Sequence, residues 1–293
     1  MKQQSAIPGW ARVLLLILPY FFVVGIFQLI GMALTGASFT DPDAAMTSEQ
    51  QLAVNFFGMI GTFFLLWIFM RYVDKEKFIC LGFHTKGRMK DFLVGTGIGL
   101  VTMIFGFLLL ISIDEIDYSG VVFNWKELGY SIILFLIVAF VEEALFRGYV
   151  LKNFMFSTNK YVALALSSAL FAIMHGMNPN ISLFSLFDLF LAGMILGITY
   201  IYTKNLWYPI GLHFGWNLFQ THFGFNVSGQ DFYSLLEFNY TTGNLLNGGE
   251  FGFEGSIFSI AAQVVIFFGA LFYYKQPEKR LPEIPFQEVE VPD

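Results

Sequence analysis

Cysteine and charged residues are both scarce in this sequence of 293 residues. The one cysteine, Cys80, excludes an intrachain disulfide framework and a cysteine-rich metal site. Charged residues make up 13% of the chain and hydrophobic residues 56%, and the mean hydropathy is +0.63. Soluble domains have about 25% charged residues. The composition is therefore typical of an integral membrane protein.

Positive charge is the scarcer sign. The formal net charge is −6, with 16 Lys and Arg against 22 Asp and Glu. Proteins that bind nucleic acid need a basic patch to neutralise phosphates. Once the basic residues that flank apolar runs are set aside, no such patch is left, so a nucleic-acid partner is excluded. The protein is expected to contact the lipid bilayer instead.

Long apolar runs dominate the rest of the chain. A membrane-spanning helix needs about 20 mostly apolar residues. Eight runs meet this requirement, near 11–35, 52–72, 91–112, 129–151, 160–177, 182–203, 206–224 and 255–275. The sequence therefore predicts an all-α fold, a polytopic bundle of about eight transmembrane helices.

The basic residues predict how this bundle is oriented, because Lys and Arg concentrate in cytoplasmic loops. Eight spans with both termini in the cytoplasm leave only Lys126 on the outer side. The residues at or near the cytoplasmic side are then Lys2, Arg12, Arg71, Lys75, Lys77, Lys86, Arg88, Lys90, Arg147, Lys152, Lys160, Lys204, Lys275, Lys279 and Arg280. The predicted outer loops are 36–51, 113–128 and 225–254, and the last is expected to fold partly over the membrane mouth.

Three regions follow from this division. Residues 1–90 are expected to form two transmembrane helices and a cytoplasmic interfacial segment, and 91–275 a transmembrane core. Residues 276–293 are proline-rich and charged and are expected to be a disordered cytoplasmic tail. The predicted location is the cell membrane, as a multi-pass protein of the bacterial plasma membrane.

Two acids and an arginine interrupt the apolar run at VEEALFRGYV, residues 141–150. An ionisable group inside a bilayer costs roughly 2.5 to 3.5 kcal/mol on insertion scales, so such residues suggest a functional site. Residues four apart share a helical face, which predicts an ion pair between Glu143 and Arg147. Glu142 points about 100° away and is left without a partner in its helix. An unpaired carboxylate in an apolar setting can act as a general base.

Few other polar residues lie at membrane depth. His175, His213 and Asn217 are drawn from two further predicted spans, and Asn217 follows His213 by one helical turn. A carboxylate and two imidazoles can activate water, and imidazole and amide hydrogens can stabilise an oxyanion. Alternatively, Glu142, His175 and His213 could hold a zinc ion that activates water. The chain has no HExxH pair, so a glutamate-activated water needs fewer assumptions.

The same residues match a family pattern. EExxxR in VEEALFR, FxxxH in FAIMH and HxxxN in HFGWN occur in this order on successive apolar segments, within residues 129–224. This arrangement resembles the CAAX prenyl protease and bacteriocin-processing family of intramembrane peptidases. The resemblance implies that Glu142, Glu143, His175, His213 and Asn217 form the active site. It also implies peptide-bond hydrolysis within or near the membrane, and it leaves the part played by a metal open.

The prediction is therefore a membrane-embedded endopeptidase. Its expected substrate is a membrane-associated protein or peptide, in CAAX-type processing or in bacteriocin maturation or self-immunity. Two alternatives use the same residues differently. A proton-coupled transporter would use Glu142 as its proton site, and a non-catalytic immunity or scaffold protein would keep the motifs but act by binding.

Overall fold

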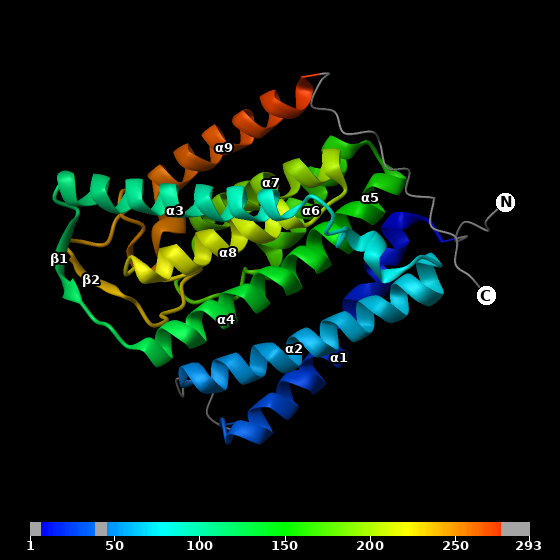
Figure 1. Cartoon of the computed structure of the whole chain (residues 1–293), viewed down its shortest axis with the longest axis horizontal. Helices are drawn as coiled ribbons and strands as arrows, with labels where there is room; N and C mark the ends of the chain where they lie inside the picture. Colours follow the sequence, from blue (N-terminus) through cyan, green and yellow to red (C-terminus); the bar gives the residue numbers. More distant parts are fainter. Residues whose placement is uncertain (1–6, 39–45, 277–293) are drawn as a thin grey trace.

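The helices of the chain run back and forth between two ends of one bundle (Figure 1). In the computed structural model, residues 7–38 and 46–276 are described. The predicted tail, 276–293, therefore lies outside the described residues except for Gln276. The longer elements are α1 (Gly9–Thr35), α2 (Ser48–Ile68), α3 (Met89–Ser112), α4 (Trp125–Glu142), α6 (Lys160–Met174), α7 (Leu183–Thr203), α8 (Trp207–His222) and α9 (Ile257–Lys275). Short helical elements are η1 (Phe69–Asp74), η2 (Phe78–Leu81), η3 (Glu143–Leu151), α5 (Lys152–Ser157), η4 (Gly249–Phe251) and η5 (Phe253–Gly255).

The prediction of a polytopic helical bundle is confirmed. Six helical segments are long and apolar enough to cross a membrane, at Gly9–Thr35, Ser48–Asp74, Met89–Ser112, Trp125–Ser157, Leu183–Thr203 and Ile257–Lys275. The other two predicted spans are shorter than expected, because α6 has 15 residues and α8 has 16. At 1.5 Å per residue each is about 23 Å long, against a hydrocarbon core of about 30 Å. Both end where the chain turns into loops that line the cavity described below.

A small sheet closes one end of the bundle, opposite the end where α5 lies (Figure 1). Strand β1 (Ile116–Val121) pairs antiparallel with β2 (Leu236–Tyr240), and the register shifts between Tyr118 and Gly120. The sequence predicts only loops at these positions, within 113–128 and 225–254. A pairing between segments more than a hundred residues apart leaves no local pattern that marks its partner.

Helices α3 and α8 are in close backbone contact through two glycine pairs. Gly95 and Gly99 on α3 face Gly211 and Gly215 on α8. A Cβ atom at Gly211 would lie 2.1 Å from the carbonyl oxygen of Phe92. Small residues four apart let membrane helices approach closely, because packing rather than water exclusion holds them together. This contact fixes α8, the helix that carries His213.

Replacing Gly211 with alanine should therefore separate α3 from α8. The methyl group would meet backbone, which cannot move aside as a flexible side chain can, so we expect a loss of about 1 to 3 kcal/mol in the free energy of unfolding. Gly97→Ala is the matched control, because a Cβ there meets nothing within 4 Å. That change should be neutral or stabilising by up to about 1 kcal/mol. Thermal unfolding of the purified proteins in detergent compares the two, and equal stability would contradict the packing argument.

Polar contacts at the α5 end join the first two helices to the rest of the bundle. Arg12 donates to Asp74 at 2.7 Å and to the amide oxygen of Asn153 at 3.3 Å. Lys152 pairs with Glu76 in the segment after α2. These three contacts lie at the end that the basic residues predict to be cytoplasmic.

Candidate active site

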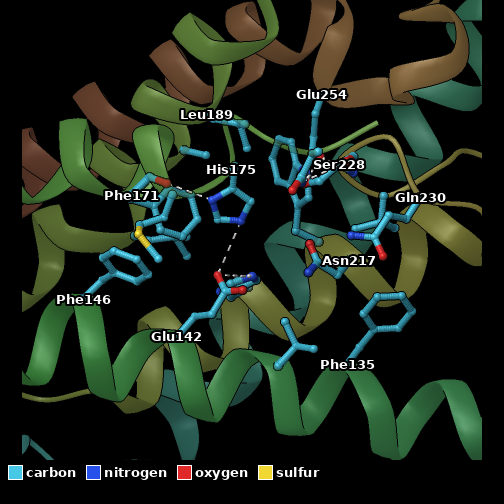
Figure 2. A pocket seen from close by; sticks show the side chains of 18 of the residues that line it. Phe135, Glu142, Phe146, Phe171, His175, Leu189, Asn217, Ser228, Gln230 and Glu254 are labelled. Carbon is cyan, nitrogen blue, oxygen red and sulfur yellow. Dashed lines mark hydrogen bonds and ion pairs between the residues drawn. The ribbon is translucent and has the colours of Figure 1, made fainter. Parts of the chain in front are cut away.

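Four of the five residues of the predicted site line one cavity, and the fifth, Glu143, is buried beside it, although they come from three parts of the bundle. Glu142 is the last residue of α4 and Glu143 the first of η3. His175 directly follows α6, and His213 and Asn217 lie one turn apart on α8. Glu142, His175, His213 and Asn217 line a cavity of about 330 Å³. Figure 2 shows Glu142 below His175, with Asn217 beside them.

The helix that carries both glutamates is not regular. The sequence predicts one helix over 129–151, but the chain changes at Glu143 from α-helix to a π-helical segment, η3. Such wide turns occur often at functional sites. Every residue of η3 is buried, so the widened turn packs in the interior of the bundle.

Glu143 and Arg147 form a buried ion pair within this segment. Arg147 Nη1 lies 2.8 Å from Glu143 Oε1, and the two side chains are 1% and 0% exposed. Arg147 also donates from Nη2 to the carbonyl oxygen of Gly193 at 3.2 Å. Its guanidinium carbon lies 4.6 Å from the centre of the Phe171 ring. The arginine is thus held by a carboxylate, a carbonyl and an aromatic face.

Glu143 has a second partner that the sequence analysis did not foresee. Nδ1 of His213 lies 2.8 Å from the same Oε1 atom that Arg147 contacts. The carboxylate therefore connects the arginine on its own helix to the histidine on α8. Helical spacing predicts contacts within one helix only, so no signal in the sequence marked this one.

The hydrogen bonds of the two histidines determine where their protons lie. His175 Nδ1 is 2.8 Å from the carbonyl oxygen of Phe171, and a carbonyl can only accept. The carboxylate of Glu143 likewise accepts from Nδ1 of His213. Each neutral imidazole therefore has its proton on Nδ1 and a lone pair on Nε2.

Both Nε2 atoms face one oxygen of Glu142. Glu142 Oε2 lies 3.8 Å from Nε2 of His175 and 3.9 Å from Nε2 of His213. These separations exceed a direct hydrogen bond and suit one small molecule between the three atoms. The oxygen is buried and has no hydrogen-bond partner among the described residues. The arrangement is a carboxylate and two imidazole lone pairs that converge on one point, which can bind and deprotonate water.

The zinc alternative can be compared with these positions. Within residues 7–38 and 46–276, no group of three or more His, Cys, Asp and Glu side chains is placed so that it could hold a metal ion. Zinc ligands lie about 2.0 to 2.2 Å from the ion in tetrahedral sites, so pairs of ligand atoms lie closer than the separations above. The residues as placed do not fit zinc.

The cavity has further polar residues that the sequence analysis missed. Glu254, Ser228 and Gln230 line it, from the loop that follows α8 (Figure 2). Ser228 donates to Glu254 Oε2 from its backbone N–H at 2.8 Å and from Oγ at 2.9 Å. Burial raises the pKa of Glu254. The loop was expected to fold over the membrane mouth, but its Gly-rich sequence gives no sign of which acid turns inward.

Other polar residues lie away from the site. Asp188 accepts a hydrogen bond at 3.0 Å from Ser259 on α9, so it joins α7 to α9. His222 Nε2 lies 3.1 Å from Ser131 Oγ, between α8 and α4.

Comparison with known proteins bears on the central part of the chain. Residues 124–219 match a family model described as Rce1-like, type II CAAX prenyl endopeptidase Rce1-like. This match confirms the family resemblance of the sequence motifs, and it contains Glu142, Glu143, His175, His213 and Asn217. A search of curated proteins found no match. The family and the apolar helices together support a membrane-integral protease.

Proposed function

Residues 124–219 match the family model of an Rce1-like type II CAAX prenyl endopeptidase. From this premise we propose that the chain is an intramembrane endopeptidase that cleaves a membrane-associated protein or peptide with a water activated by Glu142. The observation that carries the proposal is the convergence of Glu142 Oε2 with Nε2 of His175 and His213, at 3.8 and 3.9 Å. The family resemblance implies that this substrate is cleaved in CAAX-type processing, or in bacteriocin maturation or self-immunity.

The first step is activation of water. A water between the three atoms donates one hydrogen to Glu142 and the other to Nε2 of His175, because both offer lone pairs. Phe171 fixes the His175 ring through its carbonyl, and its own ring lies 4.6 Å from the imidazole. As the water oxygen attacks the scissile carbonyl carbon, its proton passes to Glu142. General base catalysis of this kind contributes about 10² to 10⁴ in rate.

The second step is stabilisation of the oxyanion. His213 donates to the oxyanion from Nε2 in its imidazolium form, since the neutral ring has its hydrogen on Nδ1. The ring takes this additional proton from solvent before the attack and keeps it through the cycle. Glu143 accepts from Nδ1 and so stabilises the imidazolium that results, as an aspartate does in a serine protease triad. The Arg147 charge offsets Glu143, so a protonated His213 balances the charge of Glu142. Asn217, one turn further on α8, supplies an amide hydrogen to the same oxyanion.

The last step is expulsion of the amine. Glu142 returns the proton that it took from water to the leaving nitrogen, and the C–N bond breaks as the carbonyl re-forms. One water is consumed, its hydroxyl goes to the new carboxyl end and its hydrogen to the new amine. The carboxylate of Glu142 is regenerated, so the cycle needs no co-reactant.

Metal content separates this mechanism from the zinc alternative. Purified protein should contain far less than one zinc per chain by elemental analysis, and a chelator should leave cleavage within about twofold. The physical reason is that Glu142 Oε2 lies 3.8 and 3.9 Å from the two Nε2 atoms, which suits a water molecule between them and is too wide for zinc ligands. A stoichiometric ion whose removal abolishes cleavage would replace the water mechanism by a metal-bound one.

A comparison of membrane proteins tests the proposed activity. Cells that express the wild-type chain are compared by mass spectrometry with cells that express Glu142→Gln at the same level. We expect at least one membrane-associated polypeptide to be shorter only where the wild-type chain is present. Identical sets of chain termini in both cell types would favour the immunity or scaffold alternative.

A further inference from the structure

The cavity extends from Glu142 mainly toward one end of the bundle, and on the other side of Glu142 it is lined by Leu145 and Phe146 of η3. On α4 its wall continues through Val138, Phe135 and Leu134, toward the start of the helix at Trp125. On α8 it continues from His213 to Trp216 and Asn217, toward the end of the helix. The loop residues Ser228, Gln230 and Glu254 complete this side (Figure 2). Apart from Leu145 and Phe146, all of these residues lie between Glu142 and the end of the bundle that carries the β1–β2 sheet.

Residues of the first two helices form part of the same wall. Gln51 and Asn55 lie near the start of α2, and Tyr20 lies on α1. All three side chains are partly exposed. Gln230, at the rim, is exposed. The cavity therefore reaches the protein surface near the sheet end of the bundle.

The opposite side of Glu142 is closed. All nine residues from Glu143 to Leu151 are buried. Arg147 is 1% exposed, Tyr149 is 0% exposed and Lys152 is 1% exposed. From Glu142 to the end of α5 at Ser157 the helix covers roughly 20 Å at 1.5 Å per residue. A polypeptide that came from this end would have to pass through packed side chains.

The basic residues predict on which side of the membrane each end lies. In the loops at the sheet end, residues 36–38, 46–51, 113–128, 176–182 and 223–256 of the described chain contain one basic residue, Lys126. The short segments at the other end contain Lys75, Lys77, Lys86 and Lys204. An excess of Lys and Arg in short loops marks the cytoplasmic side. The sheet end, and with it the cavity, is then extracytoplasmic.

We propose that the cavity receives its substrate from the extracytoplasmic side of the membrane. The substrate class is an exported or membrane-anchored polypeptide whose cleaved segment lies at the outer half of the bilayer. A lipid-modified tail held in the cytoplasm would meet the closed end instead. This inference rests on the proposed function, because a substrate presupposes peptidase activity. The direction in which the cavity opens depends only on the fold and on the distribution of basic residues.

Accessibility of single cysteines tests the direction of the opening. The chain has one native cysteine, so Cys80→Ser gives a cysteine-free background. Val138→Cys then reports on the cavity, one turn from Glu142. Thr242→Cys reports on an exposed position at the sheet end, and Lys86→Cys on an exposed position at the opposite end. Each protein is treated in right-side-out vesicles with a small, membrane-impermeant thiol reagent, before and after permeabilisation. Labelling is read by mass spectrometry.

We expect Thr242→Cys and Val138→Cys to be labelled in sealed vesicles, and Lys86→Cys only after permeabilisation. Labelling of Val138→Cys only after permeabilisation, together with Lys86→Cys, would place the opening on the cytoplasmic side and overturn the proposal. So would exchanged behaviour of Thr242→Cys and Lys86→Cys, or a Val138→Cys protein that stays unlabelled throughout.

The same measurement in a Glu142→Gln background separates this inference from the proposed function. The labelling pattern should stay the same, because access depends on the cavity and not on the base. A chain that proves to have no peptidase activity would leave the pattern unchanged, whereas an opening on the wrong side would change the pattern whatever the activity.

Discussion

Glu142→Gln is expected to lower peptide-bond cleavage by about 10² to 10⁴-fold while the fold is kept. The amide has nearly the shape of the carboxylate but cannot take a proton from water. Glu142 Oε2 makes no hydrogen bond in the part of the chain that the structure describes, so the change breaks no hydrogen bond that holds the helices there. The measurement is the rate at which purified enzyme in detergent cleaves a substrate found in the membrane comparison.

The matched control is Glu127→Gln, the same chemical change at the other end of α4. It should leave both the cleavage rate and the thermal stability near the wild-type values. Glu142→Gln should share that stability and lose only the rate. Full activity in Glu142→Gln would end the proposal that this residue is the base, and a stable but inactive wild-type chain would favour the scaffold alternative.

Arg147→Met is expected to lower the free energy of unfolding by about 3 to 5 kcal/mol. Removal of one partner leaves Glu143 as an uncompensated charge, at a position where its side chain is 0% exposed. The change also deprives the carbonyl of Gly193 of its donor and the ring of Phe171 of its cation. Thermal unfolding in detergent and the yield of folded protein both report the effect.

Two comparisons show whether the buried charge is the cause. Arg88→Met removes an ion pair of similar length, 2.9 Å to Asp91, whose side chains are 17% and 33% exposed. Its cost should be at most about 1 kcal/mol. Combining Arg147→Met with Glu143→Gln should recover part of the lost stability, since no unpaired charge is left. If Arg147→Met were as stable as Arg88→Met, the ion pair would not be what holds this part of the bundle.

Local pattern was sufficient for much of the site. The motif order predicted a site at Glu142, Glu143, His175, His213 and Asn217, and the family match over 124–219 confirms the resemblance that these residues carry. Helical spacing placed Arg147 one turn from Glu143, where the structure has it at 2.8 Å. These are short-range relations along the chain, and the periodicity of a helix is enough to express them.

Contacts between segments far apart in the sequence could not be predicted from local pattern. The bond from His213 to Glu143 joins residues 70 positions apart, and that from Ser228 to Glu254 joins a loop to a turn 26 positions later. The change to π-helix at Glu143 also has no counterpart in the apolar pattern. Each depends on how neighbouring helices pack, which the pattern of one helix does not contain.

The sequence by itself therefore determined that this is a helical membrane protein, which residues are polar at membrane depth, and on which side the basic residues gather. Hydropathy and spacing decide these properties, because the bilayer acts on each apolar segment separately. Only the tertiary structure decided that two imidazole lone pairs face one oxygen of Glu142, and that the cavity opens toward the β1–β2 sheet. The physical reason is that side-chain direction and open space arise when helices pack together, so no single segment determines them.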